Sequence, residues 1–177
     1  MRSGLVMAYK SAAAQVALPS DNAVKVTRQF AAPIALVYDA FTTPSLIQRW
    51  LLGPPGWTMP VCEMDVRVGG KYRWRWRDDK SGKEFGFHGE YRAVAAPHRI
   101  VSTEFFDSGD LGGDVGSGTV VTVELTEDDG VTTVVSLMDY GSRETRDAAM
   151  STGMTEGMEQ SYQRLDRVLT ANRPIAM

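Results

Sequence analysis

The stretch SRETRDAAMSTGMTEGMEQSYQRLDRVLT, Ser142–Thr170, decides the fold because it predicts one long helix with an apolar face. Apolar residues recur at intervals of three and four positions, which places them along one side of an α-helix. The members of this stripe are Met154, Met158, Ser161, Tyr162, Leu165, Val168 and Leu169. Charged and amide side chains fall mainly on the opposite side, so we expect the stripe to pack against the rest of the domain.

The first half of this predicted helix differs in composition from the second half. Met150, Met154 and Met158 are interleaved with Gly153 and Gly157. Two glycines inside a helix cost about 1 kcal/mol each relative to alanine, so a close backbone approach or an empty space beside the helix should offset that cost. Methionine adapts to irregular gaps and to varied apolar partners. The pattern fits either an ordinary core helix with soft packing or a helix that forms one wall of a cavity.

Length and composition predict one globular domain with a real core, because 43% of the 177 residues are hydrophobic. The net charge of -3 disfavours nucleic-acid binding as the main role. The single cysteine, Cys62, cannot form an internal disulfide. No apolar run of about 18 residues exists, so no membrane-spanning helix is expected, and residues 1–19 lack the continuous apolar segment of a signal peptide. We therefore expect a cytoplasmic protein.

The remaining chain predicts one strand, two short helices and six further strands before the long helix. Residues 1–21 are alanine-rich and weakly patterned, so we expect a flexible tail or a short frayed helix there. Residues 22–171 should form the domain, and residues 172–177 a second tail. Apolar alternation and turn residues define the strands. The predicted strands are Ala23–Phe30, Val61–Val66, Lys71–Arg77, Glu84–Val94, Arg99–Phe106, Thr119–Thr126 and Val131–Met138.

This order of elements limits the architecture. Six consecutive antiparallel strands make one large sheet, and sheets of this size twist and curl. The amphipathic helix after the last strand must bury its stripe against the inner face of that sheet. The two short helices, one beginning near Pro33 and one spanning Ser45–Trp50, would close one end. We therefore predict an α+β fold in which a curved antiparallel sheet wraps around the C-terminal helix.

Four segments resemble a known family. RQFAAPIALVYDAFTTPSLIQRWLLGPPGW (28–57), EMDVRVGGKYRWRWR (63–77), FHGEYRAVAAPHRIVSTEFF (87–106) and the C-terminal stretch (142–169) are similar to domains related to the activator of the heat-shock-protein-90 ATPase. These domains belong to the START-like, or SRPBCC, superfamily, also called helix-grip or birch-pollen-allergen-like. The resemblance covers about Val24–Leu169. It implies the helix-grip fold already expected from the order of elements.

The resemblance implies several functions rather than one, because a shared fold does not fix chemistry. Relatives are described as polyketide cyclases, carriers of lipids or aromatic ligands, antibiotic-sequestering proteins and chaperone regulators. No catalytic motif is common to all of them, so none can be carried over to residues of this chain. Members that regulate the chaperone usually contain a further domain, which this chain is too short to include.

Metal and nucleophile chemistry have little support in the sequence. The only histidines are His88 and His98, and neither they nor Cys62 stand at zinc-binding spacing. No G-x-S-x-G motif is present. The glycine-rich segment 112–118 lies between strands and opens no helix, which excludes a phosphate-binding loop. We therefore expect no metal and no cofactor.

Isolated ionisable residues in the strands leave an enzymatic alternative open. Strand alternation places His88 on the face opposite Phe85 and Phe87, so it points either outward or as a lone polar group inward. An inward histidine would suit an acid, base or hydrogen-bond role. The strand carboxylates are more often solvated on outer faces, but burial of one would raise its pKa. These carboxylates are Glu63, Asp65, Glu90 and Glu104.

The segment KYRWRWR, Lys71–Arg77, shows the clearest alternation in the chain. Its aromatic residues point to one side and its arginines to the other. Binding of single-stranded nucleic acid would need rings and charges on the same face. We therefore expect the rings inside and the arginines in solvent.

Aromatic and methionine side chains from several elements would line one cavity if the interior is hollow, and would fill a solid core otherwise. Mostly apolar walls with a few polar groups are typical of small-molecule pockets. The candidate lining residues are Trp50, Trp57, Tyr72, Trp74, Trp76, Phe85, Phe87, His88, Phe105, Met138, Met150, Met154, Met158 and Tyr162.

The favoured hypothesis is non-enzymatic binding of a small hydrophobic molecule, of aromatic, lipid or polyketide-like type, in this cavity. One alternative is an enzyme of cyclase or hydrolase type that uses His88 or a buried carboxylate as acid or base. The other is a co-chaperone-like interaction module. The expected partner is thus a small molecule and not a nucleic acid, and exposed edge strands would permit a homodimer.

Overall fold

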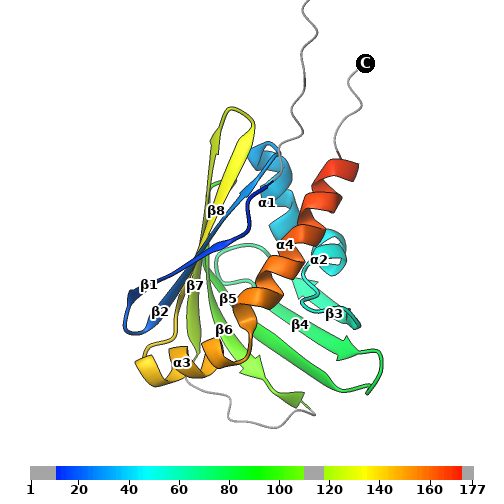
Figure 1. Cartoon of the computed structure of the whole chain (residues 1–177), viewed down its shortest axis with the longest axis vertical. Helices are drawn as coiled ribbons and strands as arrows, with labels where there is room; N and C mark the ends of the chain where they lie inside the picture. Colours follow the sequence, from blue (N-terminus) through cyan, green and yellow to red (C-terminus); the bar gives the residue numbers. More distant parts are fainter. Residues whose placement is uncertain (1–10, 110–117, 173–177) are drawn as a thin grey trace, which may run out of the picture.

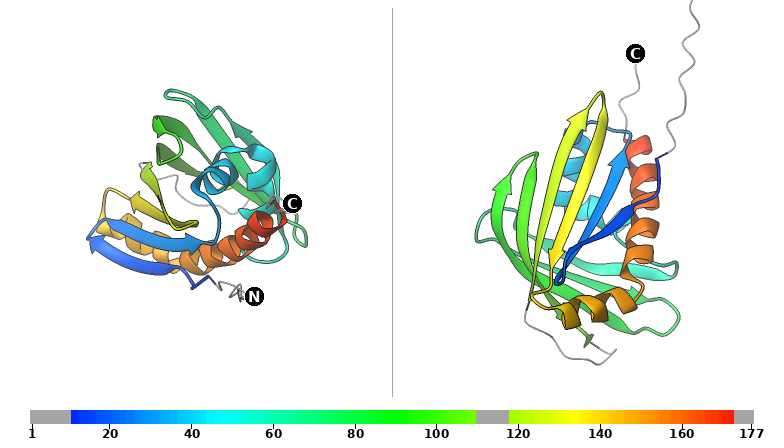
Figure 2. Two further views of the ribbon diagram at one scale, coloured as in Figure 1. Left: turned by 90° about the horizontal axis from the view of Figure 1, so that it is seen from above. Right: turned by 60° about the vertical axis from the view of Figure 1, so that its left-hand side comes forward.

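The chain forms a curved antiparallel sheet of eight strands with a C-terminal helix on its concave side (Figures 1 and 2). The computed structural model describes residues 11–109 and 118–172. The strand order across the sheet is β1-β2-β8-β7-β6-β5-β4-β3. The predicted α+β helix-grip architecture is confirmed.

The elements follow one another as the sequence predicts, with two additions. The strands are β1 (Gln15–Ser20), β2 (Ala23–Phe30), β3 (Trp57–Met64), β4 (Lys71–Asp78), β5 (Glu84–Ala95), β6 (Arg99–Asp107), β7 (Thr119–Asp128) and β8 (Val131–Asp139). The helices are α1 (Ile34–Thr42), α2 (Pro44–Trp50), α3 (Arg143–Ser151) and α4 (Met154–Ala171). The additions are β1 and the division of the C-terminal helix into α3 and α4.

Strand β1 corrects the expectation of a tail over residues 1–21. It pairs antiparallel with β2, with Val16 opposite Val26. All six residues of β1 are exposed, so this edge strand lacks the alternation of burial that marks a strand in a sequence. Residues 1–10 and 173–177 of the predicted tails lie outside the described residues.

Strand β3 begins at Trp57, earlier than the predicted start at Val61. Pro60 lies inside β3, although a proline cannot donate to the hydrogen-bond ladder. The pairing of β3 with β4 shifts between Thr58 and Val61, so an irregularity accommodates the proline. β3 is also an edge strand of the sheet, so the backbone N–H and C=O groups along its outer edge have no neighbouring strand to pair with.

The single long helix predicted over Ser142–Thr170 is wrong in one respect, because the chain bends between α3 and α4. Gly153 has a φ of 78°, in the left-handed region that glycine enters at little cost, and it caps the start of α4. α3 runs across the end of the sheet (Figure 1). Its buried Arg146 donates a hydrogen bond of 2.9 Å to the carbonyl oxygen of Ser20, which ties α3 to the β1–β2 hairpin.

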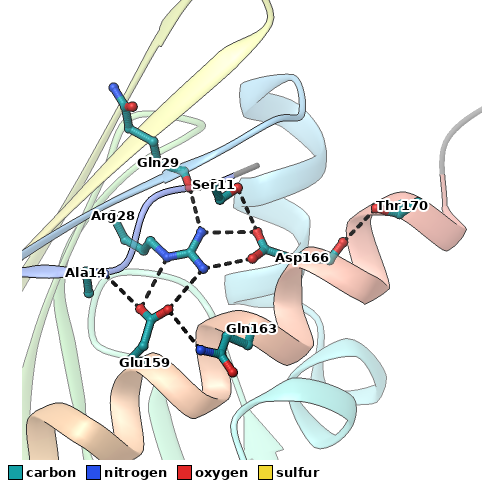
Figure 3. Close-up of polar contacts among 8 residues, drawn as sticks. All are labelled: Ser11, Ala14, Arg28, Gln29, Glu159, Gln163, Asp166 and Thr170. Carbon is teal, nitrogen blue, oxygen red and sulfur yellow. Dashed lines mark hydrogen bonds and ion pairs between the residues drawn. The ribbon is translucent and has the colours of Figure 1, made fainter. Parts of the chain in front are cut away.

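Helix α4 is fastened to the sheet by a buried arginine (Figure 3). The Arg28 side chain on β2 is 2% exposed and lies 2.8 Å from Asp166 and 3.3 Å from Glu159, both on α4. It also donates to the carbonyl oxygen of Gln29. The N-terminal segment joins this cluster, because the Ser11 hydroxyl donates to Asp166 and the Ala14 backbone N–H donates to Glu159. We call these residues the Arg28 clamp.

Candidate functional site

The inner face of the sheet carries a continuous set of aromatic side chains from β3, β4, β5 and β6. Ring centroids lie 4.6 Å apart for Tyr72 and Trp74, and 5.4 Å apart for Phe87 and Phe106. These distances and the tilted ring planes are typical of favourable aromatic pairs. This aromatic set consists of Trp57, Tyr72, Trp74, Trp76, Phe85, Phe87, Tyr91 and Phe106.

A second group reaches the interior from β8 and from the two C-terminal helices. Met150 on α3 and Met154 and Met158 on α4 pack against the same core as the buried Met138 on β8. The Tyr140 hydroxyl lies 3.2 Å from the sulfur of Met154, so it holds the start of α4 close to the end of β8. Methionine sulfur is polarisable and tolerates varied apolar partners. We call Met138, Met150, Met154 and Met158 the methionine set.

The predicted lining residues that are buried in the core are Trp50, Tyr72, Trp76, Met138 and Tyr162, and three of them lie together. Trp50 is 2% exposed and donates from Nε1 to the Ala40 carbonyl oxygen. Trp76 is 6% exposed and donates to the Leu51 carbonyl oxygen. Tyr162 stacks on Trp50 at 6.0 Å and is also buried. These side chains join α2, β4 and α4 into the closed end of the domain.

The rest of the inner face is incompletely covered. α4 makes its close backbone contacts with α1, α2, α3 and β2, which lie toward one side of the curved sheet. Trp74, Met154 and Met158 pack against the main core and Phe87 against the smaller cluster of Ile47, Met59 and Trp76, yet each remains partly accessible to solvent. Apolar side chains in a tightly filled core would be excluded from water. The partial exposure therefore indicates that solvent reaches this part of the inner face.

Two predicted lining residues, His88 and Phe105, lie on the opposite, outer face. Their rings stack at 5.5 Å with planes 14° apart, and His88 is exposed. They border a shallow outer groove of about 310 Å³ whose lining also includes Lys71, Glu90 and Arg92. The structure thus separates them from the aromatic set by the thickness of the sheet. His88 is in no position to act on a ligand held inside.

Glu104 is the carboxylate that does face inward. It shares the inner side of β6 with Phe106, while its neighbours Thr103 and Phe105 face the other side. Its side chain is only partly accessible, and burial raises the pKa of the carboxyl to about 7. Its charge raises the pKa of Tyr72 and Tyr140, in addition to the larger effect of their burial. Glu104 therefore lies within electrostatic reach of both hydroxyls.

The other three carboxylates, Glu63 on β3, Asp65 just after β3 and Glu90 on β5, are exposed, as the sequence suggested. Within residues 11–109 and 118–172 no three His, Cys, Asp or Glu side chains gather as they would around a metal ion. In the same part of the chain no helix is long and apolar enough to cross a membrane.

Two buried polar atoms of the aromatic set have no hydrogen-bond partner among the described residues. These atoms are the indole Nε1 of Trp74 and the hydroxyl oxygen of Tyr91. An unsatisfied buried donor costs about 1–3 kcal/mol, and most such atoms in proteins find a partner. A polar group of a ligand or a water molecule at the inner face would supply one.

Sequence reasoning missed three inward residues, Tyr91, Phe106 and Tyr140, and did not distinguish Glu104 from the other three acids. In β6 both parities contain apolar residues, since Val101 and Phe105 alternate with Ile100 and Phe106. Alternation alone therefore could not decide which face is inner. Pairing with β5 decides it, because Phe106 lies opposite Phe87, which packs on the inner side.

Comparison with known proteins identifies the fold and a family. Residues 31–170 match the family described as Activator of Hsp90 ATPase homolog 1-like protein. The sequence matches no curated protein significantly.

Several solved structures share this fold. A protein from Rhodobacter sphaeroides superposes with a TM-score of 0.80 at 29% identity, covering 90% of this chain and 99% of the other. Protein Ms6760 from Mycobacterium smegmatis gives 0.78 at 23% identity, covering 93% and 100%. An AHSA1-like protein from Aeromonas hydrophila gives 0.66 at 19% identity, covering 86% and 99%.

Proposed function

Because the chain belongs to the family of Activator of Hsp90 ATPase homolog 1-like proteins, we propose that it binds a small, largely apolar molecule on the inner face of its helix-grip domain. The ligand would be aromatic, lipid-like or polyketide-like. The observation that carries the proposal is the partial exposure of inward-facing apolar side chains, Trp74, Phe87, Met154 and Met158. Covering them with an apolar ligand removes nonpolar surface from water, worth about 25 cal/mol per Å² before the costs of binding.

The unpartnered polar atoms add orientation to this apolar surface. Trp74 Nε1 can donate a hydrogen bond and the Tyr91 hydroxyl can donate or accept one. Ligand pockets typically combine apolar walls with a small number of such polar groups. The enzymatic alternative loses His88, which lies on the outer face, and retains Glu104 as an inward carboxylate. Binding without turnover is the simpler proposal because it requires no second catalytic group.

The test compares two adjacent valines on β7 that face opposite sides. Val121 packs against the core on the inner side, whereas Val120 is 36% exposed. In Val121→Trp the indole would occupy the space beside the aromatic set, so we expect the affinity for the neutral fluorophore Nile red to fall about tenfold or more. Val120→Trp adds the same ring to the outer face and should bind Nile red as the wild type does.

Fluorescence titration of Nile red into both variants measures the effect, with circular dichroism to verify that each is folded. Equal affinities in wild type, Val120→Trp and Val121→Trp would show that the fluorophore binds elsewhere and would refute the proposal. Native mass spectrometry of gently purified protein provides a second readout, since a co-purified ligand should be lost from Val121→Trp first.

A further inference from the structure

The surroundings of Glu104 indicate which ligands the inner face would select. Tyr72 on β4 lies opposite Gly89 on β5. The neighbouring β5–β6 pair, His88 with Phe105, places Glu104 opposite the same glycine. Because Gly89 has no side chain, the Tyr72 ring lies over it: a Cβ built at this position would stand 2.9 Å from Tyr72 Cε1. The ring and the carboxylate therefore share one row of the inner face.

Tyr72 is fixed in this place by a hydrogen bond from its hydroxyl to the Thr103 carbonyl oxygen, at 2.7 Å. This hydrogen bond reaches across β5 to Thr103, the residue before Glu104 on β6. Because the hydroxyl donates its proton there, Tyr72 does not donate a hydrogen bond to the carboxylate. Tyr140 approaches from β8 and directs its hydroxyl toward Met154. Glu104 is thus bordered by two tyrosine rings whose polar ends are engaged elsewhere.

The carboxylate has no cation beside it in the described part of the chain. Burial raises the pKa of this carboxyl, and among the residues that the structure describes no arginine, lysine or histidine forms an ion pair with it. The basic side chains of the adjacent strands are on the outer face: Lys71 and Arg92 line the outer groove, and Arg75 pairs with Glu84 and Asp107. A partly buried carboxylate without a counter-ion is unusual, since buried charges are normally paired.

Aromatic rings strengthen the preference for a positive charge at this place. The face of a tyrosine or tryptophan ring carries negative electrostatic potential and attracts an ammonium group within about 6 Å. Tyr72 is surrounded by Trp74 at 4.6 Å and Tyr91 at 5.4 Å between ring centroids. A carboxylate flanked by rings offers both an ion pair and cation–π contacts to one ligand group.

We propose that the inner face selects ligands that join an apolar ring system to a protonated amine, with Glu104 as the specificity-determining residue that receives the ammonium group. This inference rests on the proposed function, because the ligand must first enter the same interior. The ring system would cover the aromatic and methionine sets, and the amine would lie between Glu104, Tyr72 and Tyr140. No covalent step is involved.

Binding of an amine should depend on pH in a defined direction. The titratable and charged groups that reach Glu104 are Tyr72 and Tyr140, and both stay protonated near neutral pH because burial raises their pKa. The carboxyl, with a pKa of about 7, is mostly neutral near pH 6 and mostly ionised near pH 8. An aliphatic ammonium is charged at both values. Its affinity should therefore rise about tenfold between about pH 6 and about pH 8.

The experiment uses tryptamine and its neutral alcohol analogue tryptophol, which share one ring system and differ in the terminal group. Each competes with bound Nile red in a fluorescence titration at about pH 6 and about pH 8. We expect wild type at the higher pH to bind tryptamine about tenfold more tightly than tryptophol, with tryptophol nearly independent of pH. Glu104→Gln should lose both the preference and the pH dependence while still binding tryptophol. Glu90→Gln, which changes an exposed acid on the outer face, should behave as the wild type.

The outcomes separate the two proposals. If tryptophol binds wild type as tightly as tryptamine at both pH values, the amine preference is refuted and the apolar site remains. If the preference for tryptamine persists in Glu104→Gln, another group recognises the amine and the assignment to Glu104 is refuted. If neither Nile red nor either indole binds wild type, the proposed function fails and the amine preference fails with it.

Discussion

The buried carboxyl of Glu104 lowers the stability of the folded protein at neutral and higher pH. The pKa of its carboxyl is about 7 in the folded protein, above the ordinary 4.5. A group with a raised folded-state pKa binds its proton more tightly in the folded state than in the unfolded state. Below about pH 4.5 both states are protonated and nothing is lost. As pH rises from about 4.5 to about 7, the unfolded state releases the proton first, so the free energy of unfolding falls.

This linkage predicts that Glu104→Gln is stabilised relative to wild type only at higher pH. Glutamine stays neutral, so its advantage should grow by up to about 3 kcal/mol between about pH 4 and about pH 8. Urea unfolding at both pH values measures the difference. Glu90→Gln removes an exposed acid from the outer face and corrects for the change in net charge. An advantage of Glu104→Gln that is the same at both pH values would contradict the prediction.

At the residue scale the sequence was a partial guide to the site. The alternation in Lys71–Arg77 correctly predicted the inward Tyr72 and the outward arginines, because each parity there holds one kind of residue. In β6 both parities are apolar, and Phe105 was chosen where Phe106 faces the rings. Glu104 was considered only as one of four acids, since nothing local distinguishes an inward carboxylate from a solvated one.

At the scale of elements, the two glycines near the start of α4 have different roles. Gly153 occupies the left-handed region at the bend between α3 and α4. Gly157 is an ordinary helical residue, and a Cβ there would come no closer than 3.9 Å to the Pro54 ring, which is normal van der Waals contact. The glycine pattern suggested a close backbone approach. Instead, Gly153 permits the bend between α3 and α4, and Gly157 has no evident steric role.

Alanine substitutions at the two positions should have opposite effects on stability. Gly157→Ala removes a helix-interior glycine and should raise the free energy of unfolding by about 1 kcal/mol. Gly153→Ala places a Cβ in the left-handed region and should lower it by about 1–2 kcal/mol. Thermal and urea unfolding of both variants provide the measurement. Equal and favourable effects of the two changes would mean that α3 and α4 form one continuous helix in solution.

The order of elements was predictable because strong local patterns specify it: alternation in β2 and β4 to β8, and helical spacing in α4. The elements that were predicted wrongly are those that the local sequence pattern does not determine. β1 is an exposed edge strand held by pairing to β2, and the start of β3 was obscured by Pro60. Helical spacing of apolar residues continues on both sides of Gly153, so periodicity alone cannot reveal that this one residue is left-handed and bends the chain.

On the scale of the whole molecule, the Arg28 clamp joins the N-terminal segment, the sheet and the C-terminal helix. Its guanidinium donates to two carboxylates and one carbonyl oxygen while remaining 2% exposed. Burial alone would raise the pKa of Glu159, but hydrogen bonds from Arg28 and from the Ala14 backbone lower it below its ordinary value. The clamp thus holds α4 against β2 and ties the N-terminal segment to both.

Removing the arginine should therefore cost more than removing the whole clamp. Arg28→Met leaves two partly buried carboxylates without their cationic partner, so we expect a loss of about 3–5 kcal/mol in the free energy of unfolding near neutral pH. A triple variant that adds Glu159→Gln and Asp166→Asn removes those charges and should recover much of the loss. Urea unfolding of wild type and both variants checks the two expectations. A triple variant no more stable than Arg28→Met would show that shape, rather than charge pairing, accounts for the effect.

The pH dependence of stability that comes from Glu159 in the clamp is opposite in sign to that from Glu104. A carboxyl with a lowered folded-state pKa adds stability that is present above its unfolded pKa and is lost as pH falls through the folded value. The deficit of Arg28→Met should thus shrink toward acidic pH, because protonation of Glu159 weakens the clamp in wild type as well. Glu104 is present in both proteins, so its own pH dependence cancels from this difference. The deficit of Arg28→Met should therefore be smaller at acidic pH, where Glu159 is protonated, than near neutral pH, and a deficit that stays constant would place the energy of the clamp outside its charge pairs.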